Sequence, residues 1–482
     1  MHLPDPNPLH TATQQLSFYI WTRLPSAALA QPPAARARLH GTSRHLSGRR
    51  LPTREVPGTA SDLALLDVLR LLKREPALSP LHRFPRRTAW RCTRCGNTSA
   101  AGFTQLPDGR TYCRLCIDMG RMTEGDILYS WRGPAPSARP ARLAWEGTLT
   151  PAQQQGAAAL EAAVGRGEEH LIWAVCGAGK TEMLFPALLK SLARGERAVI
   201  ATPRADVVLE LLPRLKQAFP ETEITGLYGG SSDRDRYGQL VIATTHQLRR
   251  YARAFDLVII DEIDAFPYTF DETLQYAVSQ AARPTATTIY LTATPTNALK
   301  TRLRRRTLPY TLIPRRYHGF DLPRPRLQWI GNWQKQMEKG RVPPALRSWL
   351  ESHEKAGRSV FLFVPSISSA AQLTELTGAP AVHASDPERR ERVAAFRAGH
   401  IPVLITTTIL ERGVTIANAQ VAVIGADDDI FTASALTQIA GRAGRSASAP
   451  AADVTFFHHG KTDAIVACRR YIDAMNHGRA PL

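Results

Sequence analysis

A glycine-rich segment between a short apolar run and a helical stretch has the residue types of a phosphate-binding loop. The segment Ala174–Thr181 reads Ala-Val-Cys-Gly-Ala-Gly-Lys-Thr, and it overlaps the end of the apolar run His170–Val175. Gly177 and Gly179 let the backbone curl, so that its N–H groups can converge on phosphate oxygens. A strand before the segment and a helix after it complete the context that such a loop needs.

The last two residues of this segment carry its chemistry. Lys180 would reach the β- and γ-phosphates of ATP, and Thr181 would bind Mg²⁺. The first position of the motif, usually glycine, is Ala174. A complete Gly-Lys-Thr after an apolar strand still favours a nucleotide site over a chance glycine-rich turn.

A second apolar run ends in carboxylates. Leu257–Ile260 leads directly into Asp261-Glu262-Ile263-Asp264, about 80 residues after the loop. In α/β proteins, residues that follow a strand lie at the sheet edge where ligands bind. Asp261 can hold Mg²⁺ through water, and Glu262 can orient and deprotonate an attacking water molecule. An acidic run alone is usually solvated surface, so it is the spacing from the loop that favours a metal- and water-binding role for this motif.

An arginine pair lies near the end of the chain. The segment Gln438–Arg445 reads Gln-Ile-Ala-Gly-Arg-Ala-Gly-Arg and is expected to end a helix. Arg442 and Arg445, three residues apart, would share one helical face and point at one anion. Arginines of this kind stabilise the charge that develops on a γ-phosphate and contribute ~10³-fold or more in rate.

Four of the six cysteines form two Cys-X-X-Cys pairs that enclose residues 96–112. The ligands would be Cys92, Cys95, Cys113 and Cys116. This spacing is typical of a structural zinc site, because four thiolates leave no open coordination position. Gly96 and Gly109 stand where sharp turns are needed. Arginines 91, 94, 110 and 114 surround the cluster, and their types do not decide whether the ribbon contacts DNA or is merely solvated.

Short apolar runs alternate with helical stretches in two successive sets, and these elements must position the motifs. The first set contains His170–Val175, Ala198–Ala201, Leu240–Thr244, Leu257–Ile260 and Thr288–Leu291. The second contains Ser359–Val364, Ala381–His383, Val403–Thr407, Val421–Ile424 and Val454–Phe457. Such runs are typical of parallel strands that are covered on both faces. The pattern predicts an α/β fold with two tandem parallel-sheet domains after a small zinc ribbon.

The composition suggests further boundaries. We expect a disordered basic arm at 1–60, a helix and zinc-binding ribbon at 61–132, a linker at 133–148, a first lobe at 149–300, a basic connector at 301–345 and a second lobe at 346–482. The arm prediction depends on seven arginines that face only Asp5 and Glu55. The helix prediction depends on leucines at helical spacing in Asp62–Arg74.

The chain of 482 residues has 61 Lys and Arg against 42 Asp and Glu, a formal charge of +19. This excess favours a polyanionic partner, either nucleic acid or an anionic membrane surface, although an arginine-rich composition alone produces the same charge. No apolar run approaches the ~20 residues that span a bilayer, and the first 30 residues lack the pattern of a secretory signal. We therefore expect a cytoplasmic protein with reduced cysteines.

The order of the motifs resembles that of superfamily 2 helicases from about residue 149 to the C-terminus. The resemblance implies two RecA-like domains, a glutamine motif at Leu149–Gln153 in which Gln153 reads adenine, and a third motif at Thr292–Thr294. It also implies that Gly413 contacts nucleotide. The residues that it implies for nucleic-acid binding are Thr202, Pro203, Arg204, Thr244, Thr245 and Thr407.

Within this superfamily, the cysteine cluster, the loop Trp173–Met183 and the Asp-Glu-Ile-Asp box are similar to ComFA, the late competence ATPase of Gram-positive bacteria. The resemblance implies a motor that drives single-stranded DNA into the cytoplasm during transformation. Its implied partners are the membrane DNA channel and a small phosphoribosyltransferase-like protein, which would place it at the inner face of the membrane. The sequence leaves its oligomeric state open.

Three other functions fit parts of the sequence. PriA-like replication-restart helicases also combine this core with zinc-binding cysteines, but they are longer and carry a larger cluster after the first lobe. An RNA helicase would have the same core motifs. A DNA-binding scaffold with an inactive nucleotide site is opposed by the intact Lys180, Asp261, Glu262 and arginine pair. ATP hydrolysis with and without DNA separates the enzymes from the scaffold.

Overall fold

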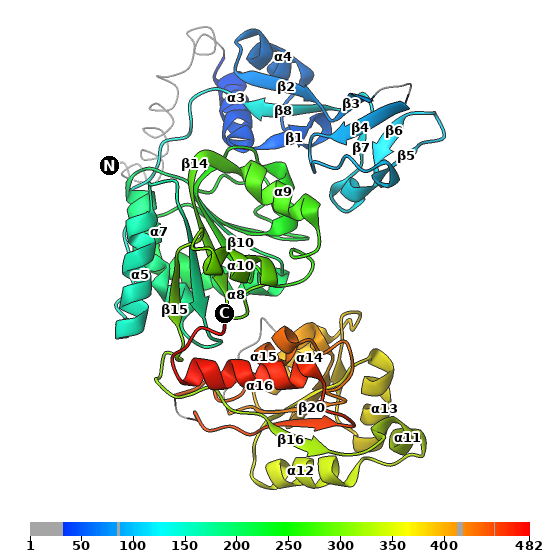
Figure 1. Ribbon diagram of the computed structural model, residues 1–482. Helices are drawn as coiled ribbons and strands as arrows, with labels where there is room; N and C mark the ends of the chain where they lie inside the picture. The colour runs from blue at the N-terminus through cyan, green and yellow to red at the C-terminus, as the bar shows by residue number, and fades with distance from the viewer. Residues whose placement is uncertain (1–31, 84–86, 412–417, 448) are drawn as a thin grey trace, which may run out of the picture. The chain divides into compact units, whose positions relative to one another are not determined.

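The computed structural model describes residues 32–83, 87–411, 418–447 and 449–482 (Figure 1). The chain divides into two compact units. One comprises Met1–Gly147, Ala158–His170 and Leu184–Tyr290, and the other comprises Thr148–Ala157, Leu171–Met183 and Leu291–Leu482. In the described ranges, no helix is both long enough and apolar enough to span a bilayer.

The first α/β sheet has seven strands in the order β11-β12-β10-β13-β14-β9-β15. Their bounds are β9 Glu169–Ala174, β10 Ala198–Thr202, β11 Ile224–Leu227, β12 Leu240–Thr244, β13 Phe255–Asp261, β14 Ala282–Thr292 and β15 Tyr310–Ile313. The pairs β10–β12, β10–β13, β11–β12 and β9–β15 are parallel. Every residue of β10 and β12 is buried. This burial explains why the strands are continuous apolar runs instead of alternating ones.

Helices connect these strands as the alternating pattern predicts. They are α5 Pro151–Ala163, α6 Lys180–Met183, α7 Phe185–Ala193, α8 Ala205–Ala218, α9 Glu272–Ala281 and α10 Asn297–Arg304, with the 3-10 helix η4 at Thr245–Arg250. In α8 the buried residues Val207, Val208, Leu211 and Leu215 recur at helical spacing, so one face of the helix is apolar. The expected α/β fold of the first lobe is confirmed.

The second sheet has six strands in the order β16-β21-β20-β17-β19-β18, and all neighbours are parallel. The strands are β16 Arg326–Trp329, β17 Val360–Phe363, β18 Ala381–Val382, β19 Val403–Thr406, β20 Gln420–Ile424 and β21 Val454–His458. The helices are α11 Trp333–Glu338, α12 Pro344–Lys355, α13 Ile367–Thr377, α14 Arg389–Arg397, α15 Ala433–Ala440 and α16 Asp463–Asn476, with the 3-10 helix η5 at Thr408–Leu410. The second parallel sheet is therefore also confirmed.

The connector expected at 301–345 is not the irregular segment that its composition suggests. Its residues 310–313 form β15 of the first sheet, and its residues 326–329 form β16 of the second. Both are edge strands, and both are less buried than the central strands, which explains why they do not stand out as apolar runs. The segment therefore adds one strand to each sheet.

The N-terminal region is a small α+β body, into which the ribbon is inserted between the second and third strands along the chain. The antiparallel sheet β1-β8-β2 is formed by Arg50–Pro52, Ile127–Trp131 and Leu72–Pro76, and it packs with α3 Pro33–Leu46, α4 Ala60–Val68 and the 3-10 helix η1 Thr53–Glu55. The ribbon contains the hairpin β3 Leu78–Arg83 and β4 Arg87–Cys92 and the sheet β5 Phe103–Gln105, β6 Thr111–Cys113 and β7 Met122–Thr123. Its 3-10 helices are η2 Ala100–Gly102 and η3 Arg114–Met119.

The prediction of a disordered arm at 1–60 is wrong for its second half; residues 1–31 lie outside the described residues. Leu39 and Leu46 of α3 are buried against Leu51 and Leu66. The arginines also have specific partners: Arg38–Asp62 at 3.1 Å, Arg44–Glu223 at 2.8 Å and Arg54–Asp126 at 3.3 Å. These carboxylates lie outside the segment, so its own composition does not reveal them.

The helix expected over Asp62–Arg74 is shorter than its leucine spacing suggests. Helix α4 begins with a capping box, in which Thr59 and Asp62 exchange hydrogen bonds, and it ends at Val68. Leu72 already pairs with Trp131 in the antiparallel sheet. Sheet pairing thus takes over where the helical pattern still continues.

Candidate functional site

The glycine-rich segment forms a loop between β9 and α6. Ala174 is the last residue of β9, and Lys180 is the first residue of α6. Gly177 and Gly179 have φ of 80° and 73°, a left-handed conformation that costs other residues free energy. Ala174 lies in the extended strand, where alanine fits without strain. The missing first glycine therefore has a local explanation.

Gln153 holds the loop from the start of α5. Its Nε2 donates a hydrogen bond of 2.8 Å to the carbonyl oxygen of Ala178, and its Oε1 accepts one of 2.8 Å from the backbone N–H of Thr150. A Cβ atom on Gly179 would lie only 2.2 Å from Nε2, so any other residue here would displace the Gln153 side chain from this hydrogen bond. The adenine-reading role of Gln153 stays a prediction.

The acidic segment follows β13 of the same sheet. Asp261 is the last residue of that strand, and its Oδ1 accepts a 2.9 Å hydrogen bond from the backbone N–H of Glu262. Glu262 has φ of 55°, which is uncommon for a residue with a side chain and costs about 1 kcal/mol or more. Such strain is concentrated at functional sites. The backbone therefore turns sharply between the two carboxylates.

The two arginines of the arginine segment lie beyond the helix in which the segment begins. Helix α15 ends at Ala440, so Arg442 and Arg445 do not share the helical face that their spacing suggests. Arg442 is buried, and its Nε donates 2.8 Å to the carbonyl oxygen of Glu411, whereas Arg445 Nε donates 3.1 Å to that of Gly441. The turn of Gly441–Gly444 places the two arginines instead.

Hydrogen bonds and close packing join the phosphate loop to this segment within one compact unit. Cys176 Sγ donates a 2.8 Å hydrogen bond to Gln438 Oε1. A Cβ atom on Gly441 would lie 2.6 Å from Cys176 Cβ. The spacing Gln-X-X-Gly thus serves packing against the loop. No pattern in the sequence indicated that Cys176 takes part.

The segment Thr292–Thr294 belongs to the same network. Thr294 Oγ1 lies 2.7 Å from Ser434 Oγ and accepts a 3.4 Å hydrogen bond from Gln438 Nε2. The carbonyl oxygen of Ala293 accepts hydrogen bonds from Trp173 Nε1, at 3.0 Å, and from the hydroxyl of Tyr471. Side chains from β9, α15 and α16 therefore meet at this segment.

The residues expected to bind nucleic acid differ in exposure. Thr202, Pro203, Thr244 and Thr245 are buried at the ends of β10 and β12. Arg204 and Thr407 are partly exposed, and Arg204 lies 3.5 Å from Asp206. Gly413 lies outside the described residues. The binding roles of all these residues stay predictions, and the partly exposed ones offer the most accessible side chains.

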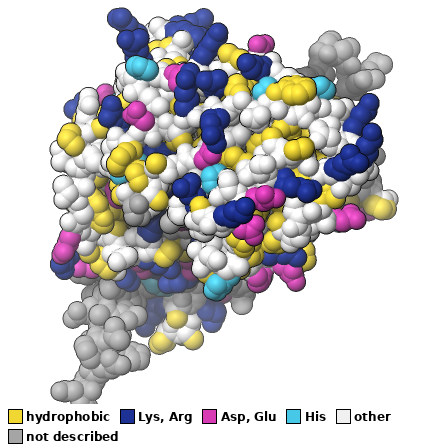
Figure 2. All heavy atoms as spheres, turned by 90° about the horizontal axis from the view of Figure 1, so that it is seen from below, with side chains coloured by type: hydrophobic (Ala, Val, Ile, Leu, Met, Phe, Trp, Pro, Cys, Tyr) yellow, Lys and Arg dark blue, Asp and Glu magenta, His cyan; other side chains and the backbone are white. Residues whose placement is uncertain are grey.

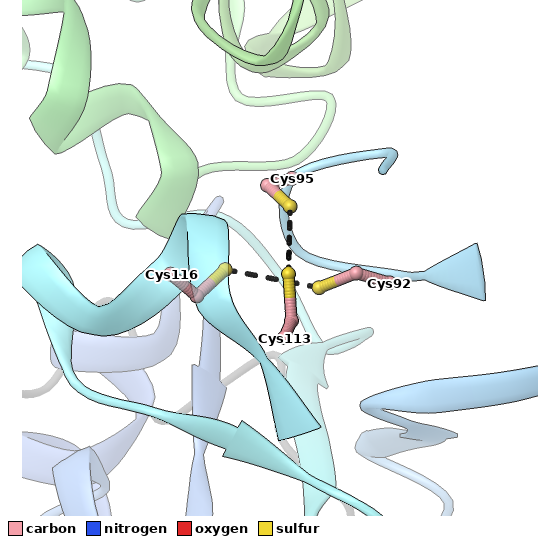
Figure 3. A group of neighbouring side chains, drawn as sticks. All are labelled: Cys92, Cys95, Cys113 and Cys116. Carbon is pink, nitrogen blue, oxygen red and sulfur yellow. Dashed lines mark hydrogen bonds between the residues drawn. The ribbon is translucent and has the colours of Figure 1, made fainter. Parts of the chain in front are cut away.

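The four predicted zinc ligands converge (Figure 3). Their sulfur atoms lie within 4.8 Å of one another, with Cys92–Cys116 at 3.7 Å and Cys95–Cys113 at 3.6 Å. Tetrahedral zinc with bonds of ~2.3 Å requires sulfur separations of ~3.8 Å. Hydrogen bonding from the Cys113 thiol, with a contribution from the positive charge of a nearby arginine, lowers the pKa of the Cys116 thiol. The four cysteines therefore fit a zinc ion.

The arginine near the cluster is Arg94, and it is part of the ribbon's interior. It is 1% exposed and donates hydrogen bonds to the carbonyl oxygens of Cys116, Met119 and Gly120. Arg94 thus holds the second cysteine pair, and it is not available for contacts with phosphate.

Gly96 of the ribbon lies close to the first lobe. It has φ of 76°, and a Cβ atom added to it would lie 2.6 Å from the ring of Tyr276 in α9.

The ribbon also holds η4, the turn that follows the Thr244–Thr245 motif. Arg249 is buried, and its Nη1 donates 2.9 Å to Asp118 and 3.1 Å to the carbonyl oxygen of Leu115, both in η3. Its Nη2 donates 2.8 Å to Thr273 of α9. No pattern in the sequence indicates this contact, because Arg249 is more than 130 residues from Leu115 and Asp118 and 24 residues from Thr273.

Comparisons with known families agree with this arrangement. Residues 37–130 match the model of the competence protein ComFA N-terminal domain, residues 150–301 that of the DEAD/DEAH box helicase and residues 342–447 that of the helicase conserved C-terminal domain. The chain is 48% identical to competence protein ComFA of Bacillus subtilis over 80% of its own length and 86% of that protein. It is 38% identical to competence protein ComFA of Streptococcus pneumoniae, over 80% of this chain and 90% of that one.

Solved structures share the fold. The chain aligns with yeast Dbp5 bound to RNA and ADP BeF3 with a TM-score of 0.51, 15% identity, and coverage of 68% of this chain and 92% of that chain. It aligns with Mss116p bound to single-stranded RNA and AMP-PNP with a TM-score of 0.52, 17% identity, and coverage of 68% and 72%. Both alignments cover about two thirds of the chain, and at these identities they show the fold alone.

Proposed function

Because the chain belongs to the ComFA family of competence proteins, we propose that it is an ATP-driven motor that moves along single-stranded DNA during DNA uptake. It is an ATP-hydrolysing, helicase-like enzyme, as its two helicase domains and its family membership indicate. The observation that most supports a working motor is the hydrogen bond between Cys176 of the phosphate loop and Gln438 of the arginine segment.

The proposed hydrolysis assigns one role to each group of residues. The backbone N–H groups of the loop and Lys180 bind the β- and γ-phosphates. Thr181 and Asp261 would hold Mg²⁺, which offsets the charge of the phosphates. Glu262 accepts a proton from the water molecule that attacks the γ-phosphorus, while the bond to the β-phosphate oxygen breaks. Arg442 and Arg445 stabilise the charge on the transferred group.

Coupling to movement would follow from the same network. The γ-phosphate would bind both the loop and the arginine segment, so its loss removes attractions that hold the two together. The strand ends that carry Arg204 and Thr407 would then change their grip on the DNA backbone. Contacts with a backbone carry little sequence information, so we expect binding that is largely independent of sequence.

The zinc that the four cysteines fit would be structural. It would join the end of β4 to η3 within the ribbon, and it leaves no position for a substrate because all four ligands are thiolates. Purified protein should contain close to one zinc ion per chain by metal analysis. Protein without zinc in which four thiols titrate while the fold persists would remove the metal from the proposal.

The cellular setting rests on the family alone. We propose that the protein acts at the inner face of the membrane, beside the DNA channel and a small phosphoribosyltransferase-like partner. Co-purification of that partner with the tagged protein from competent cells should detect the complex. Recovery of tagged protein without it would argue against this setting and leave the ATPase assignment intact.

One experiment tests the motor. ATP hydrolysis should be measured by phosphate release with no nucleic acid, with single-stranded DNA, with duplex DNA and with single-stranded RNA. We expect single-stranded DNA to stimulate hydrolysis most. Stronger stimulation by RNA would favour an RNA helicase, whose fold is shared by the RNA-bound structures described above. No hydrolysis under any condition would leave a DNA-binding scaffold.

A further inference from the structure

An arginine of the connector is buried without a counter-ion. Arg316 lies three residues after β15 and is 2% exposed. Its Nη1 donates a hydrogen bond to the carbonyl oxygen of Gly444, whereas its Nε and Nη2 are buried with no hydrogen-bond partner. In the part of the chain that the structure describes, no carboxylate pairs with it. A buried guanidinium with free donors is costly unless an anion satisfies it.

The position of Arg316 relates it to the phosphate loop. The backbone N–H of the next residue, Tyr317, donates a 3.0 Å hydrogen bond to the carbonyl oxygen of Gly177, and Val175 donates 3.1 Å to Ile313. A Cβ atom on Gly177 would lie 3.7 Å from Arg316 Cγ. The connector backbone therefore follows the loop, and the aliphatic part of Arg316 lies against its middle glycine.

The other side of Arg316 contacts the arginine segment. Its Nη1 would lie 3.1 Å from a Cβ atom on Gly444, and His318 Nε2 lies 3.2 Å from the same Gly444 carbonyl oxygen. Burial, together with the positive charge of Arg445, lowers the pKa of Arg316 to about 10. The positive charges of Arg316 and Arg445 are thus near each other where the loop meets the arginine segment. An anion at this position would relieve both the repulsion and the missing hydrogen bonds.

We propose that Arg316 binds the terminal phosphates of a nucleoside triphosphate, as a third arginine of the nucleotide site, supplied by the connector. Its Nε and Nη2 donate to phosphate oxygens beside Gly177, while its Nη1 keeps the hydrogen bond to Gly444. The planar guanidinium can make both contacts at once from different nitrogen atoms, whereas a lysine would have to make both from its single nitrogen. The inference rests on the proposed nucleotide site. It adds that the segment joining the two sheets senses the triphosphate directly.

The test compares triphosphate and diphosphate binding. The variants are Arg316→Gln, which can still donate to Gly444 but has no charge, Arg316→Lys, and Arg316→Ala. The control is Arg315→Ala, which removes an exposed arginine from the adjacent position. Dissociation constants for a fluorescent non-hydrolysable ATP analogue and for fluorescent ADP are measured with full-length protein. The melting temperature without nucleotide checks that each variant is folded.

We expect Arg316→Gln to weaken binding of the ATP analogue by about tenfold or more, as loss of a charged hydrogen bond should. Binding of ADP should change much less, Arg316→Lys should be intermediate and Arg315→Ala should bind both as the unaltered protein does. Equal loss for both nucleotides would show that Arg316 only supports the fold, and no loss would show that it does not reach phosphate. Either result overturns the inference. Failure of the unaltered protein to bind the triphosphate would overturn the proposed function as well.

Discussion

Glu262 combines a demanding backbone conformation with a proposed chemical role. Its φ of 55° lies in the left-handed region, where a side chain is disfavoured. The turn ends β13 at Asp261, so one carboxylate stays with the strand while the next leaves it. A metal ligand and a proton acceptor must lie near each other without occupying the same position. The left-handed backbone at Glu262 is consistent with such a separation of the two carboxylates.

At this scale, Lys180→Ala and Glu262→Gln should fail in different ways. Lys180→Ala removes a proposed phosphate contact and should lose both ATP binding and hydrolysis. Glu262→Gln keeps the shape of the residue and the proposed metal ligand Asp261, so it should bind ATP and hydrolyse it about 100-fold or more slowly. Nucleotide titration and phosphate release measure the two effects. Normal turnover by Glu262→Gln would assign the proton acceptor elsewhere.

Among the elements, η4 links the zinc ribbon to the first sheet. It follows β12 directly and lies between η3 of the ribbon and α9. Arg250 adds an ion pair of 2.8 Å with Glu55, which also lies 3.2 Å from Arg234. Although burial raises the pKa of Glu55, its contacts with Arg250 and Arg234 hold it below its usual value. The N-terminal region therefore supports the turn that carries Thr245.

We expect Arg249→Ala to loosen this junction. The change removes hydrogen bonds to Asp118, Leu115 and Thr273, and it should destabilise the protein by about 2 kcal/mol. Hydrogen exchange should become faster in both η3 and η4. The control, Arg253→Ala, changes an exposed arginine just after η4 and should leave exchange unaltered. Faster exchange confined to one of the two helices would mean that the ribbon does not hold the turn.

On the scale of the whole molecule, part of the charge of +19 is carried by arginines that bind partners inside the fold. Arg44, Arg49 and Arg197 bind partners within the first unit, and Arg197 is buried against Tyr237 and Tyr251. Figure 2 shows one face of the molecule, on which Lys and Arg side chains are interspersed with hydrophobic and acidic ones. The net charge therefore overstates the number of cations that are free to bind DNA.

Deletion of residues 1–31 tests this conclusion. The segment contains Arg23 and Asp5 as its only charged side chains, so its removal leaves the net charge unchanged. The slope of log affinity against log salt for single-stranded DNA should change by no more than ~0.7, the value for one phosphate contact. Fluorescence anisotropy at several salt concentrations measures it. A much larger change would show that this segment binds DNA in ways that its charge does not predict.

Local patterns in the sequence were enough to predict the two parallel sheets, the glycine-rich loop between β9 and α6 and the cysteine cluster. Strands such as β10 and β12 are buried on both faces, so a continuous apolar run is enough to identify them. The loop and the Cys-X-X-Cys pairs are local, because their glycines and thiols must lie close together in the chain. Family membership followed from the order of these same motifs.

The contacts of the arginines, by contrast, depend on how distant parts of the chain pack together. Residues such as Arg94, Arg249 and Arg316 look like solvated charges in the sequence, yet each is at least 97% buried. Their partners are mostly carbonyl oxygens, which every residue has, at distances along the chain from 22 to 134 residues. The ends of two helices also depend on tertiary packing. Helix α4 ends at Val68, shortly before β2 pairs in the sheet, and α15 ends at Ala440, before Arg442. A residue type shows that a charge is present, but only packing determines which groups accept its hydrogen bonds.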